Sequence, residues 1–592
     1  MKFLRTFFAS FLAVIAAVLI GIPLLFIFIT GIISRFNSTP EVNVSNHTVL
    51  EMRLAGPIVE NASTEPAPFS FKEFDALGLS VQPLGVYQII QSLEKARVDD
   101  RVDGIFLNLS PGIGTGWANL KAIRSALEDF KNSGKFVYAY AEAYSERNYY
   151  LASIADSIFM APQGVMEFNG LASTPMFYKG LFEKIDLEPK VFRVGTFKSA
   201  VEPYLRKDMS EPAKEQTRAC LGDIWATFLE DVALSRNTSK ERLNELADNF
   251  VFGDGASAQR TGLIDRIAYD EEVRDLLKEA SDLSDADNPR LLSFKKYLRV
   301  PNSKAKLAQN RIAVIFAEGA IQSGKSGDGV IGSQTVVKQL RKARQDKNVK
   351  AVVFRINSPG GSALASDLIA EEVRLTSEVK PIIASFGNVA ASGGYYIGAK
   401  CDRIFAQPNT ITGSIGIFAV LFDAQATMNQ KIGLTFDEVE TNRSANFASP
   451  FYPMSPAEEK LLQSYVEKGY GNFLNVVREG RGFPDSLSVD KIAQGRVWSG
   501  KAAIGIQLVD EMGDLKAAIS YAAEEAGLGS DYMLRLLPKP KSAMEELVES
   551  MSESMIEGKV PFQKELQQLE KIKQRIPGSG MYMLMPYDEQ ID

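Results

Sequence analysis

The chain has 592 residues, of which 45% are hydrophobic and 23% are charged, and its formal net charge is -7. This length and composition predict three or four structural units with ordinary globular cores. The acidic balance gives no reason to expect a nucleic-acid partner, and the two distant cysteines, Cys220 and Cys401, exclude a disulfide framework and a cysteine metal motif.

The N-terminus contains a long uncharged apolar run, FFASFLAVIAAVLIGIPLLFIFITGII, at residues 7–33. It is longer than the roughly 20 residues needed to span a bilayer. More basic residues precede the run than follow it, so the positive-inside rule keeps residues 1–6 in the cytoplasm and places the rest of the chain outside. We therefore predict a transmembrane signal anchor and, at residues 34–47, a polar stalk. A cleaved signal peptide is the alternative, although its apolar region usually has only about 7 to 15 residues.

Strands and helices alternate after the stalk, which indicates an α/β fold. Apolar runs of strand length alternate with a helix-length amphipathic segment in this part of the chain. We predict strands at residues 48–54, 102–110, 135–142 and 157–162, and a helix at residues 117–131.

The same scheme then repeats at an offset of about 246 residues, which is typical of two homologous domains. VDGIFLNLSPG at Val102 returns as VKAVVFRINSPG at Val349, and YYLASIADSIFMAP at Tyr149 returns as YYIGAKCDRIFAQP at Tyr395. The predicted boundaries are a first domain at residues 48–281, a connector at 282–307, a second domain at 308–532, and a C-terminal helical extension at 533–592 with an amphipathic stretch at 544–575.

Ser392 lies in GNVAASGGYY, directly after the short apolar strand PIIASF and before a helix start. Such a turn can expose a hydroxyl and direct backbone N–H groups at a developing negative charge, although a helix-capping serine fits the same pattern. The chain has a single histidine, His47, far upstream in the stalk, which argues against a Ser-His-Asp triad. A nucleophilic Ser392 would need another base, and a buried lysine can lose its charge and accept a proton.

The two copies differ where chemistry would take place. Glu146 stands in the first copy where Ser392 stands in the second, and Ile113 stands where Gly361 does. Conversely, Lys198 in VGTFKSAVEP aligns with Ala445 in the second copy. Ordinary drift between repeats is one explanation of this pattern, and most lysines are solvated surface groups. Complementary loss is nevertheless what a site shared between two domains produces.

These residues suggest an acyl-transfer site. Ser392 would attack an acyl carbon, Lys198 would take its proton and return it to the leaving amine, and the N–H groups of Gly361 and Gly393 could form an oxyanion hole. Ser414, in TGSIGIF, could orient the lysine, and a simple turn hydroxyl is an equal alternative. The apolar strand that begins there could pair with an extended peptide.

The succession NSPGG, AASGGYY and TGSIG, together with VGTFKSAVEP in the first copy, resembles the signal peptide peptidase A family, also called protease IV, in its long tandem bacterial form. The likeness extends over the apolar run, both repeats and the order of the motifs. It implies two tandem ClpP/crotonase-like domains of repeated ββα units and a Ser392–Lys198 dyad. It also implies an oxyanion hole at Gly361 and Gly393 and a lysine-holding hydroxyl at Ser414.

The resemblance also implies a setting. It implies a membrane-anchored homotetramer on the periplasmic face of the bacterial cytoplasmic membrane, which degrades remnant signal peptides and other extended apolar peptides without a metal or a cofactor. Two other functions stay open. A crotonase-type acyl-CoA enzyme would use the paired N–H groups without a serine nucleophile, and a membrane scaffold would need no reaction at all.

Overall fold

The computed structural model describes residues 42–63, 83–110, 112–249, 251–281, 283, 289–301 and 308–539, together with the backbone of residues 581–584. The predicted membrane anchor at residues 7–33 and the predicted amphipathic stretch at residues 544–575 lie outside these ranges. Within the ranges, we find no helix that combines the length and the apolar character required to cross a bilayer.

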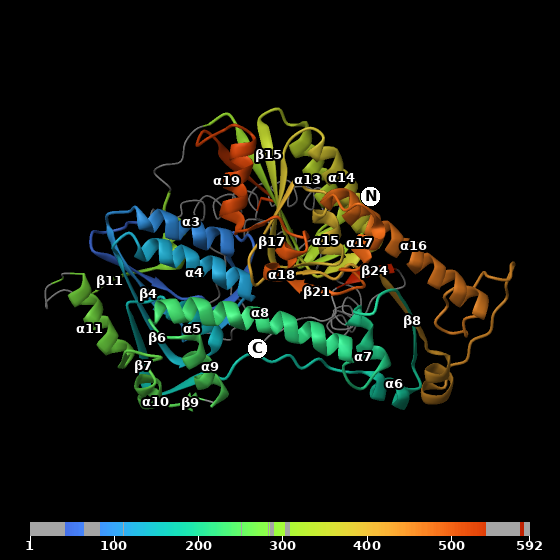
Figure 1. The fold of residues 1–592 in the computed structure, drawn as a ribbon, viewed down its shortest axis with the longest axis horizontal. Helices are drawn as coiled ribbons and strands as arrows, with labels where there is room; N and C mark the ends of the chain where they lie inside the picture. Colours follow the sequence, from blue (N-terminus) through green and yellow to red (C-terminus); the bar gives the residue numbers. More distant parts are fainter. Residues whose placement is uncertain are drawn as a thin grey trace, which may run out of the picture.

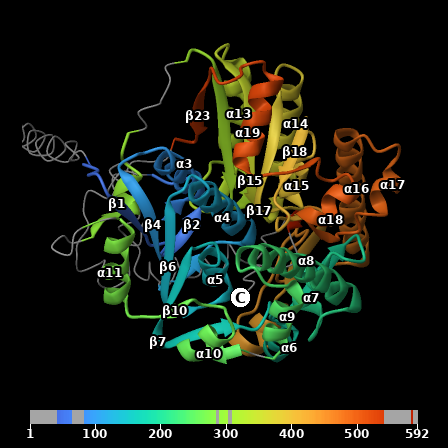
Figure 2. The ribbon, with the colours of Figure 1, turned by 60° about the vertical axis from the view of Figure 1, so that its left-hand side comes forward.

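The first copy is built on a seven-stranded sheet in the order β10-β7-β6-β4-β1-β11, with β9 beside β7 (Figure 1 and Figure 2). Neighbouring strands in this sheet run parallel to each other, except that β9 is antiparallel to β7. Its elements in chain order are β1 (Thr48–Met52), β2 (Gly56–Val59), β3 (Leu84–Gly85), α3 (Val86–Arg97), β4 (Val102–Asn108), β5 (Ile113–Gly114), α4 (Trp117–Lys131), β6 (Phe136–Tyr144), α5 (Glu146–Ala152), β7 (Ser157–Phe168), α6 (Lys179–Ile185), β8 (Glu188–Arg193), a short 3-10 turn (Ser199–Val201), α7 (Glu202–Leu205), α8 (Glu211–Ser235), α9 (Lys240–Asp248), β9 (Val251–Gly253), α10 (Gly255–Arg260), β10 (Arg266–Ile267), α11 (Asp270–Ala280), β11 (Arg290–Ser293) and α12 (Phe294–Tyr297).

Apolar side chains cover both faces of this sheet, as expected for a parallel sheet between helices. Successive residues of a strand point to opposite faces. In β4, Ile105 and Leu107 therefore join the core under α3 and α4, whereas Phe106 joins a smaller core under α11. The near-continuous apolar run that predicted this strand is the consequence of burial on both sides.

The second copy repeats this plan on an eight-stranded sheet in the order β21-β19-β17-β15-β12-β23, to which β18 and β22 add. Helices α13 and α14 cover one face, and α19 covers the other (Figure 1). Its elements are β12 (Arg311–Glu318), β13 (Ala320–Gln322), β14 (Val330–Gly332), α13 (Ser333–Gln345), β15 (Val349–Ser358), β16 (Gly360–Ser362), α14 (Ala363–Ser377), β17 (Ile382–Ala391), α15 (Gly393–Gly398), β18 (Arg403–Ala406), β19 (Ile411–Gly413), β20 (Phe418–Asp423), a π turn (Thr427–Ile432), α16 (Pro456–Arg481), α17 (Ser486–Asp490), β21 (Val497–Ser499), α18 (Gly500–Gly505), β22 (Glu511–Met512), α19 (Leu515–Glu525), β23 (Met533–Leu537) and β24 (Met581–Leu584).

The α/β alternation predicted from the sequence is confirmed, and helix α4 has the predicted bounds, Trp117–Lys131. Two segments differ from their predicted character. Part of the connector at residues 282–307 forms β11, which pairs in parallel with β1. The extension from residue 533 does not begin as a helix: its first five residues form β23, which pairs in parallel with β12. In each copy, a strand beyond the region of clear sequence repeat returns to the edge of the sheet: β11 in the first copy and β23 in the second.

A third sheet joins the two copies, in the order β14-β13-β16-β24-β20-β8. Strand β8 of the first copy pairs antiparallel with β20 of the second, from Arg193 opposite Phe418 to Glu188 opposite Asp423. The short strand β24 lies between β16 and β20 and is antiparallel to both. This sheet brings the segment that follows β8, which contains Lys198, to the second copy.

The interface between the copies also contains a buried ion pair. Arg355 on β15 is 3% exposed, and its Nε lies 2.7 Å from a carboxylate oxygen of Glu60, which is 1% exposed. The same guanidinium donates to Asn119 on α4 at 3.0 Å. Helix α8 runs from the first copy alongside β21 of the second, as Figure 1 shows. The loss of one partner would leave a buried charge unpaired, so these contacts fix how the two copies meet.

Candidate active site

Three of the residues singled out in the sequence meet in one buried cluster between the copies. The Nζ atom of Lys198 lies 2.8 Å from Oγ of Ser392, 3.0 Å from Oγ of Ser414 and 3.0 Å from the Ser414 carbonyl oxygen. All three residues are 0% exposed. Lys198 and Ser392 are 194 residues apart in the chain and come from different copies.

The environment of Lys198 favours the uncharged amine. Burial lowers the pKa of Lys198 well below its ordinary value, because an ammonium loses its hydration there. A neutral amine has two N–H donors and one lone pair. The two Ser414 oxygens accept from the N–H groups, so the lone pair is left to accept the Ser392 proton. The arrangement therefore suits a general base and its orienting hydroxyl.

Ser392 stands at a strained turn between β17 and α15. Its backbone has φ 55° and ψ -117°, a conformation that costs an L-residue on the order of 1–3 kcal/mol. Two hydrogen bonds hold the turn: the Ser392 N–H donates to the Gly413 carbonyl at 2.8 Å, and the Tyr396 N–H donates to the Ser392 carbonyl at 2.9 Å. In this conformation the Ser392 side chain points toward Lys198. The side chain of a helix-capping serine would instead accept a hydrogen bond from a backbone N–H in the first turn of its own helix. No side-chain cap bond forms at Ser392.

The lysine is held by residues that the sequence did not single out. A side chain at Gly495 would place its Cβ 2.6 Å from Cβ of Lys198, and one at Gly416 would place it 3.2 Å from Cδ. These two glycines of the second copy make room for the lysine stem. Gln216 on α8 donates to the Phe197 carbonyl at 3.0 Å and accepts from the Val497 N–H at 3.0 Å, so it links the lysine segment to β21.

No motif marked these supporting residues, because their role depends on contacts between segments far apart in the chain. Gly416 belongs to the TGSIGIF motif, but its spacing from Ser414 does not reveal that a lysine stem passes it. Gly495 and Gln216 lie in ordinary stretches of sequence.

The two glycines of the predicted oxyanion hole lie side by side. A Cβ on Gly393 would lie 3.1 Å from the Gly361 nitrogen, so the two backbones approach closely beside Ser392. Gly361 has φ 155°, and a Cβ there would lie 2.1 Å from the Ile321 carbonyl oxygen. The turn before it is fixed by Ser358, whose hydroxyl donates to the Gly319 carbonyl at 2.7 Å and accepts from the Gly360 N–H at 3.1 Å. Only glycine fits at residue 361 without displacing β13.

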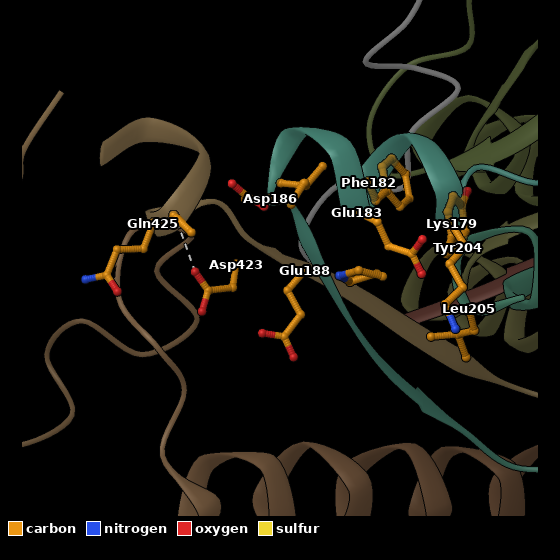
Figure 3. A pocket seen from close by; sticks show the side chains of 12 residues that line it. Lys179, Phe182, Glu183, Asp186, Glu188, Tyr204, Leu205, Asp423 and Gln425 are labelled. Atoms are coloured by element: carbon orange, nitrogen blue, oxygen red, sulfur yellow. Dashed lines mark hydrogen bonds between the residues drawn. The ribbon is translucent and has the colours of Figure 1, made fainter. Parts of the chain in front are cut away.

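Figure 3 shows another cavity, of about 480 Å³, where α6, β8 and the end of β20 meet. Four carboxylates line it, from Glu183, Asp186, Glu188 and Asp423. The described lining contains no serine, threonine or cysteine that could act as a nucleophile beside a base. The acyl-transfer chemistry therefore fits the Ser392 cluster and not this cavity.

Comparisons with known proteins agree with the presence of two homologous copies in the chain. The model of peptidase family S49 matches residues 129–284 and 374–529. Protease 4 of Salmonella typhi is 35% identical over 521 residues, which cover 86% of this chain and 82% of that protein. Protease 4 of Haemophilus influenzae is 37% identical, with 74% and 73% covered, and the chloroplastic serine protease SPPA of Arabidopsis thaliana is 32% identical, with 87% and 75% covered.

Among solved structures, ClpP1 of Listeria monocytogenes aligns with 34% of the chain and 91% of its own length, at a TM-score of 0.22 and 16% identity. A point mutant of the same ClpP1 aligns with 35% of the chain and 94% of its own length, at a TM-score of 0.24 and 15% identity. A likeness of this size does not define the fold. The ClpP/crotonase-like assignment stays a prediction, whereas the two tandem α/β copies stand on the strand order of the chain itself.

Proposed function

Because the chain belongs to peptidase family S49 and is a serine peptidase, we propose that Ser392 is its nucleophile and Lys198 its general base. The observation that carries this proposal is the 2.8 Å contact between the Lys198 amine and the Ser392 hydroxyl, two side chains that are both buried. The complementary loss of one partner from each copy gives it independent support.

The proposed reaction is a two-step acyl transfer. The Ser392 hydroxyl gives its proton to the Lys198 lone pair while Oγ attacks the peptide carbonyl carbon. The N–H groups of Gly361 and Gly393 stabilise the resulting oxyanion, and the Lys198 ammonium returns the proton to the leaving amine. Water then attacks the acyl-enzyme: the same amine takes a proton from the water and passes it to Ser392 Oγ as the acyl–Oγ bond breaks, which releases the acid and restores the serine. Ser414 acts as a positioning residue, because its two oxygens orient the amine.

We propose that the substrate is an extended apolar peptide, as in signal peptides left behind in the membrane. The position of β24 supports this binding mode, since an extended segment fits antiparallel between β16, which contains Gly361, and β20. An added strand gains main-chain hydrogen bonds, and side chains on alternate positions give selectivity. Residues 7–33 would anchor the enzyme in the bacterial cytoplasmic membrane with the catalytic copies on the periplasmic side, as a homotetramer.

Covalent labelling of Ser392 tests the proposal directly. A serine-directed fluorophosphonate should modify the purified protein at a single residue, Ser392, because the neutral Lys198 activates only that hydroxyl. Digestion and mass spectrometry identify the labelled peptide. Heat-unfolded protein serves as the control and should show no labelling. An intact protein that cleaves peptides while Ser392 stays unmodified would contradict the assignment, and a crotonase-type enzyme would not label at all.

The rate of peptide cleavage is expected to fall at low pH. Burial lowers the pKa of Lys198, so the amine is neutral above that lowered pKa and protonated below it. Each unit of pH below this pKa should reduce kcat/KM about tenfold, because only the neutral amine accepts the serine proton. The measurement is a profile of kcat/KM against pH.

A second group complicates this profile. Burial and the Glu60 carboxylate raise the pKa of Glu318 to about 7, and Glu318 accepts from Asn357, next to the turn that contains Gly361. The profile should therefore also be measured in the variant Glu318→Gln, which has no titrating carboxyl at this position. The decrease in kcat/KM at low pH that is due to protonation of Lys198 should remain in this variant. A flat profile through acid pH in both proteins would argue against a lysine base.

A further inference from the structure

The first copy keeps the frame of the catalytic groove but not its reactive groups. We propose that the free edge of β5 and the cavity beside it bind an extended apolar peptide without cleaving it, as an exosite for the uncut part of the substrate. The choice of ligand rests on the proposed function of the Ser392 site, whereas the site itself rests on the geometry of the first copy.

The two copies present equivalent strands at this position. In the first copy β3, β2 and β5 pair in that order, and in the second β14, β13 and β16 do so. Ile113 on β5 lies opposite Gly56, as Gly361 on β16 lies opposite Ile321. The far edge of β16 carries the antiparallel strand β24. The corresponding edge of β5 has no strand beside it in the part of the chain that the structure describes.

A cavity of about 500 Å³ lies beside this edge. Gly112 and Gly114 are exposed on either side of Ile113, so the backbone of β5 is accessible to another chain. Ile113 and Trp117 are buried, and they provide apolar surface where the cavity meets the core. The unpaired edge of β5 resembles the edge of β16 that β24 covers in the second copy. We therefore infer that the occupant is also an extended strand, bound by main-chain hydrogen bonds and by the contact of one apolar side chain.

The cavity lacks the means to cleave what it binds. Glu146 takes the place of Ser392, and one of its carboxylate oxygens accepts from the N–H groups of Asn169 at 2.7 Å and Gly170 at 3.2 Å. Its turn is also relaxed, because Ser145 caps α5 in an ordinary extended conformation with φ -90°. A carboxylate held in this way is no substitute for an activated hydroxyl, so a bound peptide would leave intact.

The edge lies next to the catalytic copy. Directly after β5, the Thr115 hydroxyl accepts from the side-chain amide of Asn388 at 3.4 Å, and the Asn119 N–H donates to the Asn388 oxygen at 2.9 Å. Asn388 is on β17, the strand that ends at Ser392. A segment bound at β5 is therefore close to a part of the first copy that contacts β17, the strand before the nucleophile, and it would retain a long substrate while another part of it is cut.

Photo-cross-linking locates bound peptide without any cleavage. The probe is a synthetic peptide with the sequence of residues 580–586, GMYMLMP, in which the tyrosine is replaced by benzoylphenylalanine. It is irradiated with the full-length Ser392→Ala protein, and the modified residues are mapped by mass spectrometry. We expect cross-links within residues 112–117 and 145–147. Cross-links confined to β16 and β20 would overturn the exosite and leave the proposed function standing.

A matched pair of variants tests the cavity. A Cβ at Gly112, which lines the cavity, meets nothing within 4 Å, so Gly112→Phe adds a large side chain at the cavity, and Gly222→Phe makes the same change on the exposed face of α8, where a Cβ also meets nothing within 4 Å. Gly112→Phe should reduce cross-linking at residues 112–117 by roughly tenfold or more, since the bound side chain loses its space, and Gly222→Phe should not. Equal cross-linking in both variants would overturn the proposal. Failure of fluorophosphonate to label Ser392 would instead count against the proposed function alone.

Discussion

Replacement of Lys198 by methionine is expected to lower kcat for peptide cleavage by about 10⁴-fold or more, the scale seen when one member of a catalytic unit is removed. Methionine keeps the apolar stem between Gly416 and Gly495 but has no lone pair to accept the Ser392 proton. The fold should survive, because the change removes an amine from a site that is already closed to water. The measurement is kcat on a peptide substrate, with the thermal midpoint measured in parallel.

Controls separate the base from a general effect of losing a lysine. The Lys214 side chain on α8 of the same copy is 43% exposed and pairs with Glu211, three residues earlier, so Lys214→Met should retain full activity. The double variant Ser392→Ala/Lys198→Met should be no slower than either single variant, because the two groups act as one unit. Normal kcat in folded Lys198→Met protein, or additive losses in the double variant, would exclude the dyad.

Replacement of Gly361 by alanine is expected to reduce kcat by about 10² to 10³-fold, the effect of losing one oxyanion donor. The new Cβ would lie 2.1 Å from the Ile321 carbonyl oxygen, so β16 must move away from β13 and carry the Gly361 N–H with it. The loss should appear mainly in kcat, because the donor acts on charge that develops in the transition state. Steady-state kinetics with separate kcat and KM test this.

The comparison variant for this prediction is Gly222→Ala, where a Cβ meets nothing within 4 Å and improves helix propensity. It should show unchanged kinetics. If Gly361→Ala raised KM and left kcat intact, the residue would bind the substrate in its ground state and would not be an oxyanion donor.

The sequence predicted the centre of the site because its chemistry left few choices. A chain with one histidine, in the stalk, directs attention to a lysine, and the internal repeat showed which copy had kept Lys198 and which had kept Ser392. The central strands of the sheets, such as β4 and β17, were also predictable, since burial on both faces produces continuous apolar runs.

Other features could not be predicted because they depend on contacts between distant segments. Gly495 and Gln216 hold Lys198 only because β8 crosses to β20 and places that loop against the second copy. The return of β11 and β23 to their sheets was missed because a short strand at a domain end has too few residues for a periodic pattern. The short strand β24 lies far from both of its partners along the chain, and local propensity does not specify such pairing.

The separation of Lys198 and Ser392 by 194 residues has a consequence for biosynthesis. If the two residues act as proposed, a nascent chain that contains only its first copy has the Lys198 amine but not Ser392, which is synthesised 194 residues later. The two residues meet only when the copies pack together, and the buried contact of Arg355 with Glu60 belongs to the same interface. Under the proposed mechanism, a chain that contains only its first copy therefore has no proteolytic activity.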